Sequence, residues 1–176
     1  KDDGKFAVKE IILAGEDILV RESTTVKTRD VRYDETEKIG YFDYEGTVTD
    51  DKNKLKAKGR KGKYDENKKM FYAGDVTGTK VVDYKGKDND VEFSGEQGAY
   101  DSDKEIFKLQ RNVKITVDDI VTTGNQLDYY INTDEVKSDT PLTVRQKNLQ
   151  LVGKKGTVNL EKKTVKADFV TVTTDE

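Results

Sequence analysis

Residues 98–117 read GAYDSDKEIFKLQRNVKITV, a turn signal followed by a long alternating segment. Apolar side chains occupy every second position from Phe107 to Val117, with Arg111 as the exception. Alternation of this kind is typical of a β-strand with one buried face, because successive side chains point to opposite sides. The preceding residues 101–105 are rich in types that favour turns. The stretch therefore predicts a hairpin tip that leads into a strand with one dry face.

The same signature recurs along the chain at intervals of about 30 residues. It consists of a small or apolar residue, any residue, Tyr-Asp, four polar residues and an apolar residue. Three copies fit it closely, at 31–39 (VRYDETEKI), 62–70 (GKYDENKKM) and 98–106 (GAYDSDKEI). Two looser copies follow at 128–136 (DYYINTDEV) and 157–165 (TVNLEKKTV), where Tyr130 and Asn159 take the place of the tyrosine. A regular period of this length predicts one stacked hairpin per copy.

The repeat also indicates how the units are assembled. An isolated hairpin is only marginally stable in water, so the units are expected to stack and share an apolar interior. Further strands are expected near residues 8–13 and 18–20, ahead of the first copy. We therefore predict an all-β fold, an elongated twisted antiparallel β-jelly roll built as a two-sheet stack of short repeated hairpins. Residues 1–176 are expected to form one domain, with the assignment weakest over residues 1–30.

Composition argues against several classes of function. Lys and Arg number 32 and Asp and Glu number 35, finely interspersed, so no broad positive field exists to attract nucleic acid. The chain has no His and no Cys, which removes the commonest general base and any thiol nucleophile or thiolate metal ligand. Asp34, Asp65 and Asp101 recur at one place in the repeat, as turn caps would, so a two-carboxylate glycosidase is not favoured. We expect no enzyme activity, no cofactor and no metal.

Three segments together resemble a known family. The first is residues 98–117 itself, a tyrosine-aspartate hairpin followed by an alternating strand in which Arg111 stands where glycine is commoner. The second runs from Thr123 to Val144, and the third, LVGKKGTVNL, covers residues 151–160. The chain is similar in these segments to the periplasmic lipopolysaccharide-transport proteins LptC and LptA, the OstA-like group. The third segment favours LptC.

The resemblance implies a function and a set of partners. It implies a twisted jelly roll, open along one side, that holds acyl chains between its sheets. Such a protein passes lipopolysaccharide, without chemistry of its own, from an inner-membrane ABC transporter along a β-jelly-roll bridge to the outer membrane. The implied partners are lipopolysaccharide, an LptA-like periplasmic bridge protein and the inner-membrane transporter subunits. The implied location is the periplasm, with anchoring to the inner membrane by an N-terminal helix that precedes Lys1.

The alternation and the resemblance together define candidate site residues. The inner-face apolar residues are expected to line the acyl groove, because lipid tails need a non-directional apolar lining. They are Phe107, Leu109, Val113, Ile115, Val117, Leu142, Val144, Leu149 and Leu151. Partner chains are expected to add to the exposed end strands, head to tail. The candidate edge residues are Phe6, Val8, Ile11 and Leu13 at one end and Phe169, Thr171 and Thr173 at the other.

Other interpretations of the same residues stay open. The apolar stripe is equally consistent with an ordinary packed core, and the protein with a stiff surface or adhesion spacer that has no lipid ligand. An LptA-like soluble bridge is a further alternative. The alternating cations of residues 54–60 favour a solvated outer face over a phosphate site. Residues 101–105 lack the glycine and the distal glutamate of a calcium loop, and Gly153 and Gly156 favour a turn over a phosphate cradle.

Overall fold

The computed structural model describes residues 10–12, 16–21 and 24–174, and these consist of strands and turns with no helix. The prediction of an all-β fold is confirmed. No helix capable of spanning a membrane is found in this part of the chain. The strands are β1 (Glu10–Ile12), β2 (Glu16–Arg21), β3 (Thr24–Arg29), β4 (Arg32–Asp34), β5 (Ile39–Phe42), β6 (Gly46–Asp50), β7 (Leu55–Asp65), β8 (Met70–Tyr84), β9 (Lys87–Asp101), β10 (Ile106–Val117), β11 (Ile120–Tyr130), β12 (Glu135–Ser138), β13 (Leu142–Gln146), β14 (Leu149–Gly153), β15 (Lys155–Asn159), β16 (Thr164–Asp168) and β17 (Thr171–Thr174).

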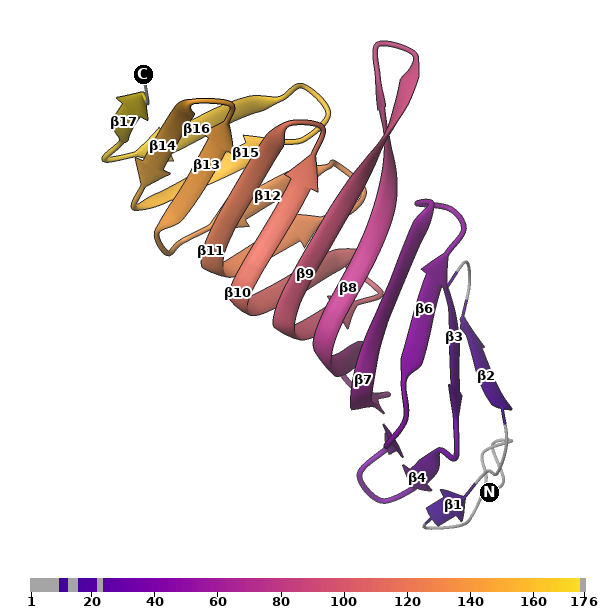
Figure 1. Cartoon of the computed structure of the whole chain (residues 1–176). Coiled ribbons are helices and arrows are strands. Elements are labelled where there is room, and N and C mark those ends of the chain that lie inside the picture. The colour runs from indigo at the N-terminus through magenta and orange to yellow at the C-terminus, as the bar shows by residue number, and fades with distance from the viewer. Residues whose placement is uncertain (1–9, 13–15, 22–23, 175–176) are drawn as a thin grey trace.

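The strands form one antiparallel ladder that is bent into two facing layers (Figure 1). Layer A has the order β2–β3–β6–β7–β8–β9–β10–β11–β13–β14–β17, and layer B has the order β1–β4–β5–β7–β8–β9–β10–β11–β12–β15–β16. The five strands β7 to β11 belong to both layers. The elongated two-sheet stack is thus as predicted. These five strands are not short, however, since each has 11 to 15 residues.

The long strands cross between the layers along one side of the stack, which we call the fold line. The pairing register slips there, between Lys58 and Gly62 in β7 and between Gln110 and Lys114 in β10. A β-bulge bends a strand and increases its twist, so one continuous strand can leave one layer and enter the other. In β10 the bulge is made by two residues of left-handed conformation, Arg111 (φ 63°) and its neighbour (φ 49°). The length of these strands, which were expected from the sequence to be short, follows from these bulges.

The predicted hairpin tips are the turns of layer B. Asp34, Asp65 and Asp101 each accept a hydrogen bond at Oδ1 from the backbone N–H three residues later, at 2.9, 3.0 and 2.9 Å. The residue four positions after each aspartate has a left-handed backbone, with φ between 55° and 60°. Successive tips are also linked by backbone hydrogen bonds. The N–H of the residue after one capping aspartate donates to the carbonyl oxygen of the left-handed residue in the preceding tip, as in Glu66 N to Lys38 O at 2.9 Å. The repeat therefore encodes the tip and its stacking.

The last two copies are aligned differently from the sequence interpretation. Phe107 pairs with Tyr129, so Tyr129 and not Tyr130 continues the inward row that begins with the earlier tyrosines. Asn159 caps its turn through Oδ1, which accepts from Lys162 N at 2.8 Å. Asn159 therefore takes the place of the aspartate, and the inward position of that copy is Val158. The sequences of these two copies depart too far from the other three to fix the register. The predicted alignment is therefore wrong by one residue.

The extra residues between the second and third copies form the extended end of the β8–β9 hairpin, which rises beyond its neighbours in Figure 1. The pairing continues to Tyr84 opposite Lys87. Lys85 and Gly86, the two turn residues, both have positive φ, 52° and 75°. This is the geometry of the tight hairpin turns whose twist matches that of the strands.

Candidate functional site

The candidate site is the interior between the layers. Seven of the nine predicted groove residues are buried there with 7% exposure or less, namely Phe107, Leu109, Val113, Ile115, Val117, Leu142 and Val144. Phe107 and Leu109 face inward from layer B, and the other five from layer A. Leu151 is half-buried and packs against this core, whereas Leu149 is 44% exposed. The alternation thus identified an inner face, but at Leu149 the opposite layer no longer covers the side chain.

The middle of the interior is filled by aromatic side chains. Phe93 projects from layer A and meets Phe107 and Tyr129 of layer B, with ring centroids 5.0 and 5.8 Å apart. Phe107 also packs on Tyr100 at 5.4 Å. Gly78 of β8 pairs with Phe93 of β9 and leaves room for its ring, since an added Cβ at Gly78 would lie 2.1 Å from that ring. The two layers interlock through these rings.

Space between the layers is correspondingly small. One cavity of about 80 Å³ lies near the C-terminal end, where Val117, Ile120, Val144, Leu151 and Val165 are among its lining residues. Another, of about 30 Å³, lies in the N-terminal half. A site for a drug-sized ligand takes about 300 Å³ or more. Neither of these two cavities is large enough to hold a fatty chain as it stands, so such a chain enters them only if the layers part.

One polar group in the interior has no partner among the described residues. Thr122, on β11, is fully buried, and its Oγ1 makes no hydrogen bond. It lies in the inner row of layer A between Ile115 and Val144. An unpaired buried hydroxyl costs about 1–3 kcal/mol. This threonine was not singled out from the sequence as a polar residue on the inner face.

The side of the stack opposite the fold line is its mouth, where turns of layer A face tips of layer B. No backbone pairing joins the layers there in the described ranges. Three groups of polar side chains cross it instead, which we call clasps. In the first, Asn53 Nδ2 and Lys52 Nζ of the β6–β7 turn each lie 3.2 Å from Glu105 Oε1 of the β9–β10 tip. Buried Asp50 accepts a hydrogen bond at Oδ2 from Tyr100 OH at 3.1 Å.

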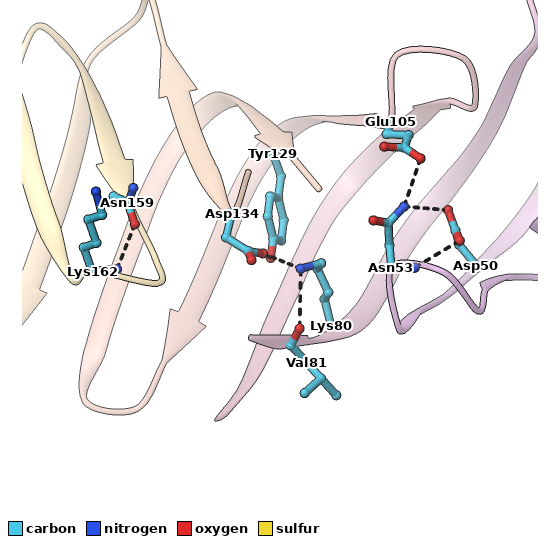
Figure 2. A network of polar contacts seen from close by, with 9 residues as sticks. All are labelled: Asp50, Asn53, Lys80, Val81, Glu105, Tyr129, Asp134, Asn159 and Lys162. Carbon is cyan, nitrogen blue, oxygen red and sulfur yellow. Dashed lines mark hydrogen bonds and ion pairs between the residues drawn. The ribbon is translucent and has the colours of Figure 1, made fainter. Parts of the chain in front are cut away.

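The second clasp joins Lys80 of β8 to the β11–β12 tip (Figure 2). Lys80 Nζ lies 2.5 Å from Asp134 Oδ1, and Tyr129 OH donates to the same oxygen at 3.0 Å. Lys80 Nζ also donates to Val81 O at 3.4 Å. The two ionic side chains are only 7% and 13% exposed. This is a buried ion pair at the rim of the apolar interior.

The third clasp is an ion pair between Asp118, in the β10–β11 turn of layer A, and Lys163, in the β15–β16 tip of layer B. The clasps thus follow one another along the mouth from the N-terminal to the C-terminal half. Each connects a turn or strand of one layer to a tip of the other that lies about 45 to 54 residues away in the chain. Such pairs depend on long-range register, so no local sequence signal predicted them.

The surroundings of two clasp tyrosines raise the pKa of their phenol groups. Burial, followed by the charge of Asp50, raises the pKa of Tyr100 above its ordinary value. Burial, followed by the charge of Asp134, raises the pKa of Tyr129 in the same way. Both phenols therefore stay protonated and donate to their carboxylates across the neutral pH range. The arrangement closes the mouth with hydrogen bonds and charges.

The other singled-out motifs have structural places. Asp101 caps its own turn, Asp103 pairs with Lys69 and Glu105 belongs to the first clasp, so these three carboxylates do not converge. No group of candidate metal ligands is found among the described residues. Gly153 and Gly156 flank a turn packed closely on Ala167. Three cations of the segment 54–60, Lys56, Lys58 and Arg60, are exposed on the outer face of β7.

The candidate edge strands lie at the ends of the stack. Phe6, Val8 and Leu13 fall outside the described residues, and Ile11 lies in β1 opposite Tyr33. At the other end, β17 pairs with β14 and β16 with β15, and in the described part of the chain neither has a second neighbour. Phe169 is 75% exposed, and Thr171 and Thr173 are exposed as well. The C-terminal end is therefore an open, partly apolar edge.

Comparison with protein families accounts for most of the chain. The family model described as "Lipopolysaccharide-assembly, LptC-related" matches residues 35–167. The chain belongs to this LptC-related family. The match covers the four later copies of the repeat, all three clasps and every predicted groove residue. It confirms the family suggested by the tyrosine-aspartate hairpins, and with it a role in periplasmic lipopolysaccharide transport.

Other comparisons are more distant. A solved structure of LptH from Pseudomonas aeruginosa, described as the LptA-homologous periplasmic component of its lipopolysaccharide transport device, is similar with a TM-score of 0.35 and 13% identity. The alignment covers 87% of the LptC-related chain and 95% of LptH. No curated protein matches the chain significantly.

Proposed function

We propose that this LptC-related chain is a non-enzymatic carrier that holds the acyl chains of lipopolysaccharide between layers A and B and hands the lipid on. The observation that carries the proposal is an apolar interior, continuous from β3 to β16, whose layers are joined by backbone only at the fold line in the part of the chain that the structure describes. Opening the mouth requires breaking side-chain contacts and leaves the ladder intact. The opened interior would offer the lining that lipid tails need.

Photo-crosslinking tests this proposal. A photoreactive residue at Ile115 or Val144 points into the interior, whereas one at Lys114 or Thr143 points outward from the same strands. With lipopolysaccharide present, we expect lipid adducts at the two inward positions and few at the outward ones. Adducts to the protein alone at Ile115 and Val144 would instead favour the stiff spacer, which the packed interior of this structure also suits.

We propose that the partners add to the ends of the ladder. An LptA-like periplasmic protein would pair with β16 or β17, whose outer edges have no neighbour in the described chain. Unpaired strands accept another strand through main-chain hydrogen bonds, and exposed apolar side chains such as Phe169 add affinity. The inner-membrane transporter subunits would bind the N-terminal end.

For location, family membership indicates the periplasm. We propose that the protein is held at the inner membrane by a helix N-terminal to Lys1, as an LptC-like component is, so that its ladder extends away from the transporter. Fractionation of the native full-length protein tests this, with recovery in the inner-membrane fraction expected. Recovery in the soluble periplasmic fraction would favour the LptA-like bridge instead.

A further inference from the structure

Lys80 is a charged residue in a row of inward-facing apolar residues. It faces inward from β8, paired with Leu55 on one side and Val91 on the other, and both neighbours are fully buried. The row continues through Val117 and Ile120, which are also buried. A lysine is rarely buried unless it is paired. Here the partner, Asp134, comes from the tip of the opposite layer (Figure 2).

A buried ion pair of this kind adds little to the free energy of unfolding. Desolvation of the two charges offsets most of their attraction, and apolar residues of similar volume are often as stable. An ammonium that is already desolvated and oriented, however, is suited to exchange one oxyanion for another, because it stays paired throughout. The position of Lys80 fits such an exchange, since it lies at the mouth with apolar side chains on both sides.

We propose that Lys80 binds a phosphate group of the lipid at the mouth, in place of the carboxylate of Asp134. This rests on the proposed function, because it names the group that this interior selects at its entrance. Lysine is a compact charge that binds phosphate well. With the phosphate on Lys80 Nζ, the acyl chains of the same molecule would lie against Leu55, Val91 and the residues beyond them.

The exchange also opens the mouth. Asp134 Oδ1 is the atom through which the β11–β12 tip is tied to β8, and it holds Tyr129 OH as well. When phosphate takes Lys80, this carboxylate turns to solvent and the tip loses its ionic link to layer A. The first and third clasps, which lie on either side, each have one exposed partner in their ion pair, Lys52 and Asp118, and such pairs are weaker barriers. Entry of a phosphorylated amphiphile is thus coupled to parting of the layers.

Lipid binding by the full chain tests the proposal. The probes are fluorescently labelled lipid A with its phosphates, the same lipid after enzymatic dephosphorylation, and inorganic phosphate as a competitor. The test variant is Lys80→Met combined with Asp134→Asn, which removes both charges at similar volume and keeps an acceptor for Tyr129. The matched control is Lys56→Met, which removes an exposed cation on the outer face of β7. Melting temperature and circular dichroism establish that each variant is folded.

We expect the wild-type chain and Lys56→Met to bind the phosphorylated lipid about tenfold or more tightly than the dephosphorylated one. The double variant should bind both lipids equally, at the affinity of the dephosphorylated form. Asp134→Asn alone should bind the phosphorylated lipid more tightly than wild type, because the competing carboxylate is gone.

Three results would count against the proposal. A wild-type chain that binds both lipids equally overturns the role of Lys80 while leaving the carrier function in place. Displacement of the labelled lipid by an equal concentration of inorganic phosphate shows a site for free phosphate and overturns it too. Binding of neither lipid by the wild-type chain overturns the carrier function as well.

Discussion

Arg111 has a left-handed backbone, φ 63°, at the point where β10 crosses from layer B to layer A. Residues other than glycine avoid this conformation because the Cβ approaches the following carbonyl, at a cost of about 1–2 kcal/mol. The side chain of Arg111 is exposed. In the family that the sequence resembles, glycine is commoner at this position. The left-handed backbone explains why.

We therefore expect Arg111→Gly to raise the free energy of unfolding by roughly 0.5–1 kcal/mol, since glycine relieves the backbone strain but adds entropy to the unfolded chain. Urea denaturation measures the change. Arg111→Ala is the matched control and should give no gain, because alanine keeps the Cβ. Equal stabilisation by both substitutions would show that the arginine side chain, not its backbone, is unfavourable.

The clasp tyrosines predict a dependence of stability on alkaline pH. Burial and the nearby Asp50 raise the pKa of Tyr100 in the folded protein, whereas in the unfolded chain a tyrosine titrates near 10. The stabilisation is therefore complete below about pH 10 and is lost as the pH rises above it, by up to about 1.4 kcal/mol per pH unit. Urea midpoints between pH 8 and pH 11 should fall less steeply for Tyr100→Phe than for wild type. Parallel curves would mean that this phenol ionises normally.

At the scale of the element, the hairpin tip is a single design used repeatedly. Its parts are a capping carboxylate or amide, three further residues and a left-handed residue that accepts from the next tip. The β6–β7 turn of layer A has the same form, with Asp50 Oδ1 accepting from Asn53 N at 3.2 Å and Lys54 left-handed. The natural use of Asn159 in one copy shows that the cap needs an acceptor and not a charge.

This leads to a pair of substitutions at Asp101. Asp101→Ala should lower the free energy of unfolding by about 1 kcal/mol, because Asp103 N and Lys104 N lose their acceptor. Asp101→Asn should change it by no more than about 0.3 kcal/mol. Thermal or urea unfolding of the two variants distinguishes them. A large loss with asparagine would indicate that the negative charge itself is required.

The elements show what the sequence could and could not predict. Turn chemistry and alternation are local, so the first three tips and the inner face of β10 were predicted correctly. The register of the fourth and fifth copies was wrong by one residue, because Tyr129 and Tyr130 are adjacent and their letters do not say which faces inward. The continuity of β7 to β11 through both layers depends on bulges, which leave little trace in the sequence.

At the scale of the whole molecule, the ladder ends in an exposed strand edge. Phe169 is 75% exposed, with Lys154 Nζ 5.0 Å from its ring centroid. An exposed aromatic side chain contributes little to the fold but is frequent among residues that dominate binding. Phe169, Thr171 and Thr173 were named from the sequence as candidate edge residues, and their contact with a partner chain stays a prediction.

Phe169→Ser should therefore weaken binding of an LptA-like periplasmic partner about tenfold or more while leaving the melting temperature unchanged. Surface plasmon resonance measures the affinity. Tyr44→Ser is the matched control, because Tyr44 is also an exposed aromatic residue, at 44%, but lies toward the N-terminal end. Loss of affinity only in Tyr44→Ser would place this partner at the opposite end of the ladder.

The clasps belong to the same scale, and they could not be predicted. Lys80 and Asp134 are 54 residues apart and meet only because each strand between them has its observed length and register. Lys80 was not singled out from the sequence. A closed mouth also changes the account of the interior, which the alternation described correctly as apolar but could not describe as packed.

The central claim is that lipopolysaccharide enters between the layers through the mouth. Because the chain has no native cysteine, Asn53→Cys with Glu105→Cys can be linked across the first clasp by a short bismaleimide, with a photoreactive residue at Ile115 as reporter. We expect lipopolysaccharide adducts at Ile115 in the unlinked protein and in the Asn53→Cys single variant treated with the same reagent, and their loss once the mouth is linked. Equal labelling of the linked and unlinked proteins would contradict entry through the mouth, and no labelling in either would contradict the lipid-holding interior.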